Sequence, residues 1–159
     1  MEVTNEVKLI NVYSKLIYCV TIWGGTLDKY CKRIQVAQNR VIRTMYGLQR
    51  QDSVRMYYVN LKMLNFNQIY KLFSSLLIFK FHKIGYCKDI FTKVNEVHVR
   101  PTRAAAYDTF VITPKIKEVF NSVIYKSPVF YNSLPLHIKE SQSTREFKGK
   151  LKFYLQQEA

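Results

Sequence analysis

The hydrophobic and polar positions between residues 27 and 47 follow the period of one amphipathic helix. Apolar side chains recur three and four residues apart on one side: Leu27, Tyr30, Ile34, Ala37, Val41, Ile42 and Met45. Basic side chains, which we call the basic stripe, gather on the opposite side: Lys29, Lys32, Arg33, Arg40 and Arg43. At about 1.5 Å per residue the stripe extends over roughly 21 Å. The pattern predicts a helix that Thr26 caps and Gly47 ends, with one face in a core and the other facing phosphates.

Three further segments have the same helical period. The first covers residues 5–21 and begins at Asn5. The second covers residues 65–85 and is apolar around most of its circumference, which is typical of a central core helix. Either Asn65 or Asn67 can cap it. The third begins at the capping box of residues 143–146 and continues to residue 155.

The remaining segments are shorter and less regular. Asp52 and Ser53 are expected to cap a short helix that ends near residue 60, and Pro135 begins another that ends near residue 139. The β-branched and aromatic content of residues 107–113 and 120–125 suits short strands, which could pair as a hairpin. The sequence therefore predicts a mainly α, bundle-like fold with room for one small β-hairpin in the C-terminal half.

The two halves of the chain differ in regularity. Residues 1–85 are expected to form a helical part, and residues 86–159 a mixed part that docks on it. A chain of 159 residues with 48% hydrophobic residues is long and apolar enough to build a core. We expect one compact unit.

The charge of the chain is strongly unbalanced. Twenty-five basic and 11 acidic residues give a net charge of +14. Such an excess favours a polyanionic partner, RNA or DNA first and an anionic membrane surface second, although a merely basic domain remains the alternative. Four basic side chains outside the stripe could add contacts: Arg100, Arg103, Lys148 and Lys150. No apolar run approaches the ~20 residues of a membrane span, so we expect no membrane partner.

The ionisable and nucleophilic residues form no recognisable catalytic pattern. The aspartates Asp28, Asp52, Asp89 and Asp108 are isolated in sequence, so a two-metal site would need carboxylates that converge only in the fold. The spacing of Cys87 from its nearest histidines matches no compact zinc site, and no phosphate-binding glycine loop occurs. We therefore expect no catalytic residues, no metal and no cofactor.

The cysteines indicate a compartment rather than a site. There are three, an odd number, and none forms a C-x-x-C pair. This usage is typical of reduced thiols, and we expect an intracellular protein of the nucleus or cytoplasm.

Six motifs occur in the order found in one known family. They are Tyr18-x-x-x-x-Trp23-Gly24-Gly25-Thr26, the run Ile34-Gln35-Val36-Ala37-Gln38-Asn39-Arg40-Val41-Ile42-Arg43, Leu61-x-x-Leu64 followed by Ile69-Tyr70-Lys71-Leu72, His98-x-x-x-Thr102-Arg103, Phe130-Tyr131-Asn132-Ser133-Leu134-Pro135, and Phe147-Lys148-x-x-Leu151-Lys152-x-Tyr154-Leu155. In this order they resemble the C-terminal region of reverse transcriptases of non-LTR retrotransposons, LINE-type elements similar to jockey and RTE. Tyr131 stands where that family usually has tryptophan.

The resemblance implies a role beside primer and template. In that family this region occupies thumb and post-thumb positions, whereas the paired aspartates of the polymerase and the endonuclease lie elsewhere and are not in this sequence. The resemblance thus implies a non-catalytic C-terminal fragment of an RNA-directed DNA polymerase that binds nucleic acid through its basic helix. A host-retained domain for protein interaction, without nucleic-acid binding, and an independent enzyme are the alternatives.

Overall fold

The computed structural model describes residues 2–97 and 106–157 and is mainly helical. The elements are α1 (Glu2–Ile17), α2 (Val20–Trp23), α3 (Asp28–Tyr46), α4 (Arg55–Asn60), α5 (Phe66–Ile84), α6 (Val94–Val97), the 3-10 helix η1 (Lys117–Asn121), α7 (Val123–Asn132), α8 (Leu136–Lys139) and α9 (Thr144–Gln157). The prediction of a mainly α fold is confirmed.

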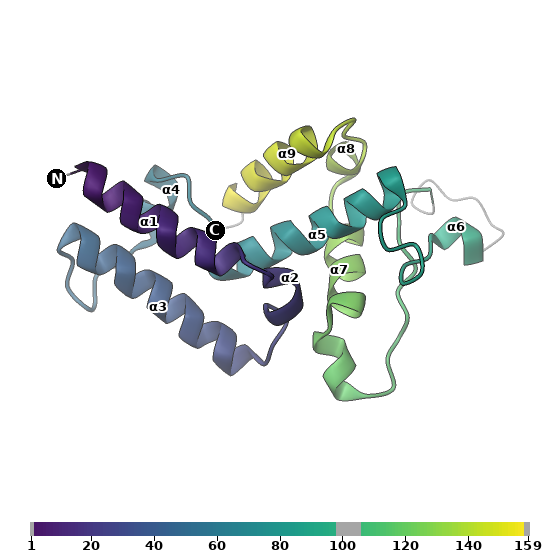
Figure 1. Cartoon of the computed structure of the whole chain (residues 1–159), viewed down its shortest axis with the longest axis horizontal. Helices are drawn as coiled ribbons and strands as arrows, with labels where there is room; N and C mark the ends of the chain where they lie inside the picture. The colour runs from purple at the N-terminus through teal and green to yellow at the C-terminus, as the bar shows by residue number, and fades with distance from the viewer. Residues whose placement is uncertain (1, 98–105, 158–159) are drawn as a thin grey trace.

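Helix α5 is the centre of the core, and helices α2, α3, α7 and α9 all pack against it. Its N-terminus is fixed by a complete capping box, in which Asn65 accepts from the backbone of Gln68 and the Gln68 side chain accepts from the backbone of Asn65. Gly85 ends it in the left-handed conformation that glycine adopts without strain. Figure 1 shows α9 on one side of α5, α3 on the other and α7 crossing it. The prediction of a central helix capped by Asn65 is confirmed.

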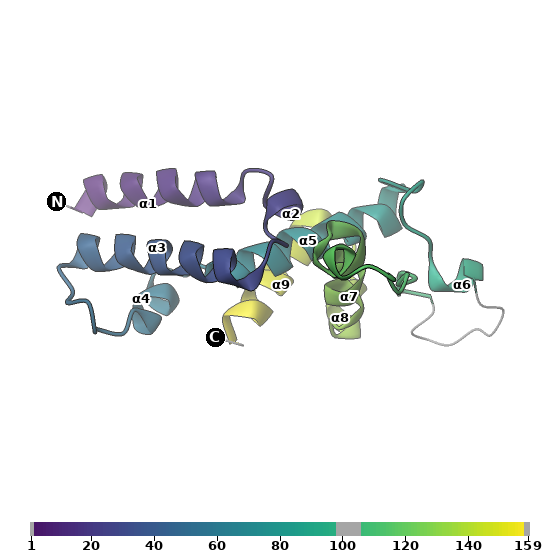
Figure 2. The same cartoon turned by 90° about the horizontal axis from the view of Figure 1, so that it is seen from below.

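Helices α1 and α3 lie side by side and run in opposite directions, as both views show (Figures 1 and 2). The tight turn between them depends on two glycines that lie against α5. A Cβ atom on Gly24 would come within 2.6 Å of the ring of Tyr70, and one on Gly25 would overlap the backbone oxygen of Asn121. The W-G-G motif is therefore the point at which the α2–α3 connection meets the core.

The first helix begins and ends earlier than predicted. It begins at Glu2, so Asn5 is not its cap, and the left-handed backbone of Cys19 (φ 49°) separates α1 from α2. The indole Nε1 of Trp23 donates to the backbone oxygen of Tyr18, 2.6 Å away, and so occupies a carbonyl that the helix leaves free. The helical pattern of residues 5–21 gives no sign of this break, because the residue that stabilises it, Trp23, lies outside that segment.

Two predicted caps are also wrong. Leu27 rather than Thr26 precedes α3, and no side chain caps the helix. Val54 precedes α4 in place of Asp52 or Ser53, although the Ser53 hydroxyl accepts from the backbone of Arg55 at 3.4 Å. Gly47 ends α3 as predicted, and α8 begins directly after Pro135.

The expected hairpin of residues 107–113 and 120–125 does not form. The second segment belongs to the end of η1 and the start of α7, and the first is an extended loop. Thr109 in that loop makes an isolated antiparallel bridge with Lys93 instead. Both predictions rested on short apolar runs, which do not by themselves distinguish a strand from a helical turn.

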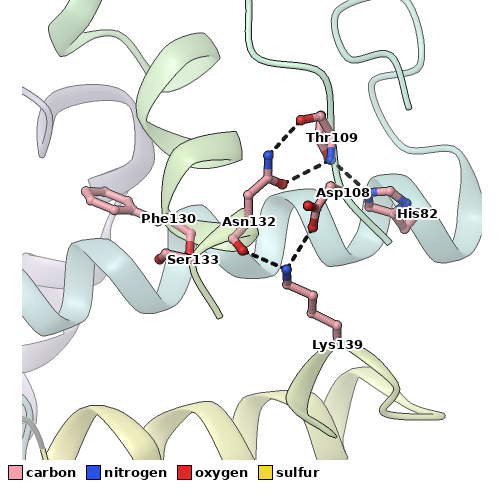
Figure 3. A network of polar contacts seen from close by, with 7 residues as sticks. All are labelled: His82, Asp108, Thr109, Phe130, Asn132, Ser133 and Lys139. Atoms are coloured by element: carbon pink, nitrogen blue, oxygen red, sulfur yellow. Dashed lines mark hydrogen bonds and ion pairs between the residues drawn. The ribbon is translucent and has the colours of Figure 1, made fainter. Parts of the chain in front are cut away.

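The extended loop is held by side chains from α5, α7 and α8 (Figure 3). The Asn132 amide accepts from the backbone N–H of Thr109 at 3.0 Å and donates to its carbonyl at 2.8 Å. His82 lies 2.8 Å from the Thr109 hydroxyl. Lys139, only 7% exposed, donates to Asp108 at 2.8 Å and to the Asn132 carbonyl at 2.7 Å. Asn132, in the N-S-L-P motif, thus binds the two backbone groups of Thr109 that a neighbouring β-strand would otherwise bind.

Candidate nucleic-acid interface

The basic stripe lies on the face of α3 that points away from α5. Lys29, Lys32, Arg33 and Arg40 are exposed. On the opposite face Gln38 and Ile42 are buried, at 3% and 0% exposure. The buried face is narrower than predicted, because Leu27, Tyr30 and Ala37 are exposed. Within residues 2–97 and 106–157, none of the four exposed stripe residues forms an ion pair with a carboxylate.

Arg43, the fifth stripe residue, is half-buried and held in place. Its Nε and Nη2 atoms both donate to the backbone carbonyl of Asp52, at 3.1 and 3.0 Å. The Asp52 carboxylate in turn accepts from the backbone of Gln49 at 2.7 Å. These bonds fix the turn between α3 and α4 around one arginine whose charge no carboxylate within the described residues neutralises by an ion pair.

A hollow of about 630 Å³ opens beside Arg43, and we call it the arginine hollow. It is lined by Val36, Arg40, Arg43, Thr44, Leu48 and Arg50. Three guanidinium groups around one concave surface suit a phosphate, because each presents planar N–H donors and a permanent charge. The sequence pattern did not single out Arg50, which lies beyond the end of the helix and joins the stripe only through the turn that follows Gly47.

The amides of α3 connect the helix to the rest of the fold. Gln38 donates to the Leu64 carbonyl at 3.0 Å, and the Gln35 oxygen accepts from the backbone of Phe66 at 2.9 Å. Asn39 Oδ1 accepts from the Tyr58 hydroxyl at 2.8 Å. Burial raises the pKa of the Tyr58 phenol to about 12, so it remains a donor at neutral pH. The Q-x-x-Q-N part of the second motif is therefore the link between α3, α4 and the start of α5.

A second hollow of about 400 Å³, which we call the amide hollow, lies between α3, α4 and the ends of α5 and α9. Its polar lining includes Gln35, Asn39, Arg43, Tyr58, Asn65 and Gln156. Its apolar lining consists of Val54, Val59 and Met63. Figure 2 shows α4 and the C-terminal end of α9 together on the side of α3 away from α1. Arg43 lines both hollows, so they adjoin along one side chain.

The other candidate basic residues are not brought to α3. Arg100 and Arg103 lie outside the described residues. Lys150 pairs with Glu146 at 2.7 Å and donates to the His137 carbonyl at 3.3 Å, at the end of α9 that contacts α8. Lys148 lies over the ring of Phe73, 5.6 Å from its centroid. The structure thus groups the stripe with Arg50 and the hollows, and separates it from the α9 lysines.

The described part of the chain contains neither a cluster of metal-ligating side chains nor a membrane-spanning helix. No three His, Cys, Asp or Glu side chains there lie close enough together to hold a metal ion. His82, near Cys87 in sequence, is directed to Thr109. No described helix has both the length and the apolar character needed to cross a bilayer.

Comparisons of the chain with protein-family models, with curated proteins and with solved structures find no match. The likeness to non-LTR reverse transcriptases therefore rests on the six ordered sequence motifs. The basic stripe and the two hollows are structural features that do not depend on that likeness.

Proposed function

We propose that this chain is a nucleic-acid-binding, thumb-like module, related to the C-terminal region of non-LTR reverse transcriptases, that binds RNA or DNA through α3. The observation that carries the proposal is the exposed row of Lys29, Lys32, Arg33 and Arg40, which no carboxylate of the described residues neutralises by an ion pair. The net charge of +14 adds a long-range attraction for a polyanion. The proposal assigns binding, and no catalytic step, to these residues.

The mode of binding follows from the geometry of the stripe. Its residues extend along most of a straight 19-residue helix, so they can follow successive phosphates of one strand. Arg43 is already ordered by the Asp52 carbonyl, which lowers the entropy lost when it meets a phosphate. Contacts of this kind position a strand without reading its bases.

The alternative is a protein-interaction domain in which the stripe is a solvated face. One observation favours it. The side chains Ile10, Tyr13, Ile17, Leu61 and Met63 line an open hollow of about 430 Å³ between α1 and the α4–α5 turn. Ile10 is 66% exposed there.

The proposal is tested by fluorescence anisotropy of a labelled single-stranded oligonucleotide. Arg33→Glu with Arg40→Glu should weaken binding by more than about tenfold and leave the helical circular-dichroism spectrum unchanged, because both side chains are exposed. The matched control is Lys88→Glu with Lys115→Glu, which changes the net charge equally at exposed positions off α3. Equal weakening by the two double variants would show that net charge alone acts. Equal binding by wild type and the α3 variant would favour the interaction domain.

A further inference from the structure

The amide hollow has hydrogen-bonding capacity that the fold does not use. The side-chain oxygens of Gln35, Asn39, Asn65 and Gln68 each accept a bond within the protein, and that of Asn39 accepts two. The side-chain N–H₂ groups of Asn39 and Asn65 have no recorded partner within the described residues. Asn39 and Asn65 therefore keep N–H donors unused at this hollow while their oxygens are occupied.

Gln156 adds a third unused donor, and this one is buried. Its Nε2 atom is shielded from solvent and has no hydrogen-bond partner in the described part of the chain. An unsatisfied buried donor costs about 1–3 kcal/mol, so native proteins rarely keep one without a reason. Because the Gln156 side chain lines the hollow, we expect an occupant there to provide the missing acceptor.

We propose that the amide hollow binds one unstacked nucleobase of a single strand whose backbone lies on the basic stripe. The inference rests on the proposed function, and it names the part of the ligand that the stripe does not bind. Unused N–H donors favour bases with carbonyl acceptors, such as thymine, uracil or guanine, over adenine, which offers only ring nitrogens as acceptors and whose exocyclic group is itself a donor. Val54, Val59 and Met63 offer an apolar surface for the flat face of the base.

The position of the hollow supports a base rather than an unrelated ligand. Arg43 forms part of the wall of both hollows. A phosphate in the arginine hollow would therefore lie next to a base in the amide hollow, as in a nucleotide. A volume of about 400 Å³ falls within the usual range for small-ligand sites and is enough for a base with its sugar.

The test compares three labelled strands of equal length, oligo-dT, oligo-dA and an abasic backbone, at one salt concentration. Wild type should bind oligo-dT about fivefold or more tightly than the abasic strand and oligo-dA. Val59→Trp should fill the hollow from an exposed position and remove the preference, while keeping the affinity for the abasic strand. Val129→Trp, at an exposed valine on α7 outside the hollow, is the matched control.

A second variant separates recognition from folding. Gln156→Leu removes an unsatisfied buried donor, so it should not lower the unfolding temperature, yet it should reduce the preference for oligo-dT. Equal wild-type binding of oligo-dT and the abasic strand, or a preference that survives Val59→Trp, would overturn the base-binding inference and leave the stripe proposal standing. Failure to bind any of the three strands would overturn both.

Discussion

Asn132 provides the sharpest test of how the C-terminal half is held together. Its amide pairs with both backbone groups of Thr109, a residue with 0% exposure, in a loop that lacks a β-sheet partner there apart from one bridge (Figure 3). Asn132→Ala would leave a buried N–H and a buried carbonyl without their partners. Each orphaned group costs about 1–3 kcal/mol, so the variant should lose about 3 kcal/mol of unfolding free energy.

That loss is large against the total stability of a single domain, which is about 5–15 kcal/mol. For a domain of this size it corresponds to a fall of about 6–12 °C in the unfolding temperature. Urea and thermal unfolding followed by circular dichroism measure both quantities. The control is Asn67→Ala, an exposed asparagine in the first turn of α5, which should change stability by less than about 0.5 kcal/mol. If the two variants unfold together, the Asn132 amide does not hold the loop, and the account of the N-S-L-P motif is wrong.

Three further predictions concern two glycines, a half-buried histidine and polymerase activity. Gly25→Ala should lower the free energy of unfolding by about 2 kcal/mol or more, because its Cβ would overlap the Asn121 carbonyl. Gly149→Ala, in an open part of α9, should raise it by about 1 kcal/mol. Thermal unfolding measures both changes. Burial, aided by Lys93, lowers the pKa of His82 to about 4. As the pH drops, the His82 imidazole therefore binds a proton in the unfolded chain before it does so in the folded chain. The free energy of unfolding should fall between pH 6.5 and 4, by at most about 3 kcal/mol. His82→Gln should flatten that part of the curve of unfolding free energy against pH. Primer extension on an RNA template with Mg²⁺ or Mn²⁺ should give no product above a buffer control, and template-dependent product from rigorously purified protein would require a carboxylate site that we do not assign.

The elements that the sequence predicted well are those whose signals are local. The cap at Asn65 and the glycine stops at Gly47 and Gly85 act within one helical turn, so they can be recognised without the fold. The break at Cys19 depends on the Trp23 indole, and the loop around Thr109 depends on Asn132, 23 residues away. Such distant partners leave no periodic pattern in the sequence, so neither the break at Cys19 nor the loop around Thr109 could be predicted from it.

The candidate site also has one part with a local sequence signal and other parts that form only when distant segments meet. The stripe could be predicted because it lies on one helix and repeats with the helical period. The hollows could not, since α3, the following turn, α4 and α9 meet only in the folded chain. One signal was present in the sequence, because Gln35, Gln38 and Asn39 are amides beside the apolar face of α3. Polar residues at such positions require partners, and their partners turned out to be the start of α5 and Tyr58.

The most direct test of the central claim is the salt dependence of oligonucleotide binding, measured for wild type and for Arg33→Glu with Arg40→Glu. Five phosphate contacts predict a slope of about −3.5 for log K against log salt on a single strand, over about 50 to 200 mM salt. The variant keeps at most three of these contacts, so its slope should fall to about −2. A wild-type affinity indifferent to salt, or one slope shared by both proteins, would contradict the claim that α3 binds the phosphates.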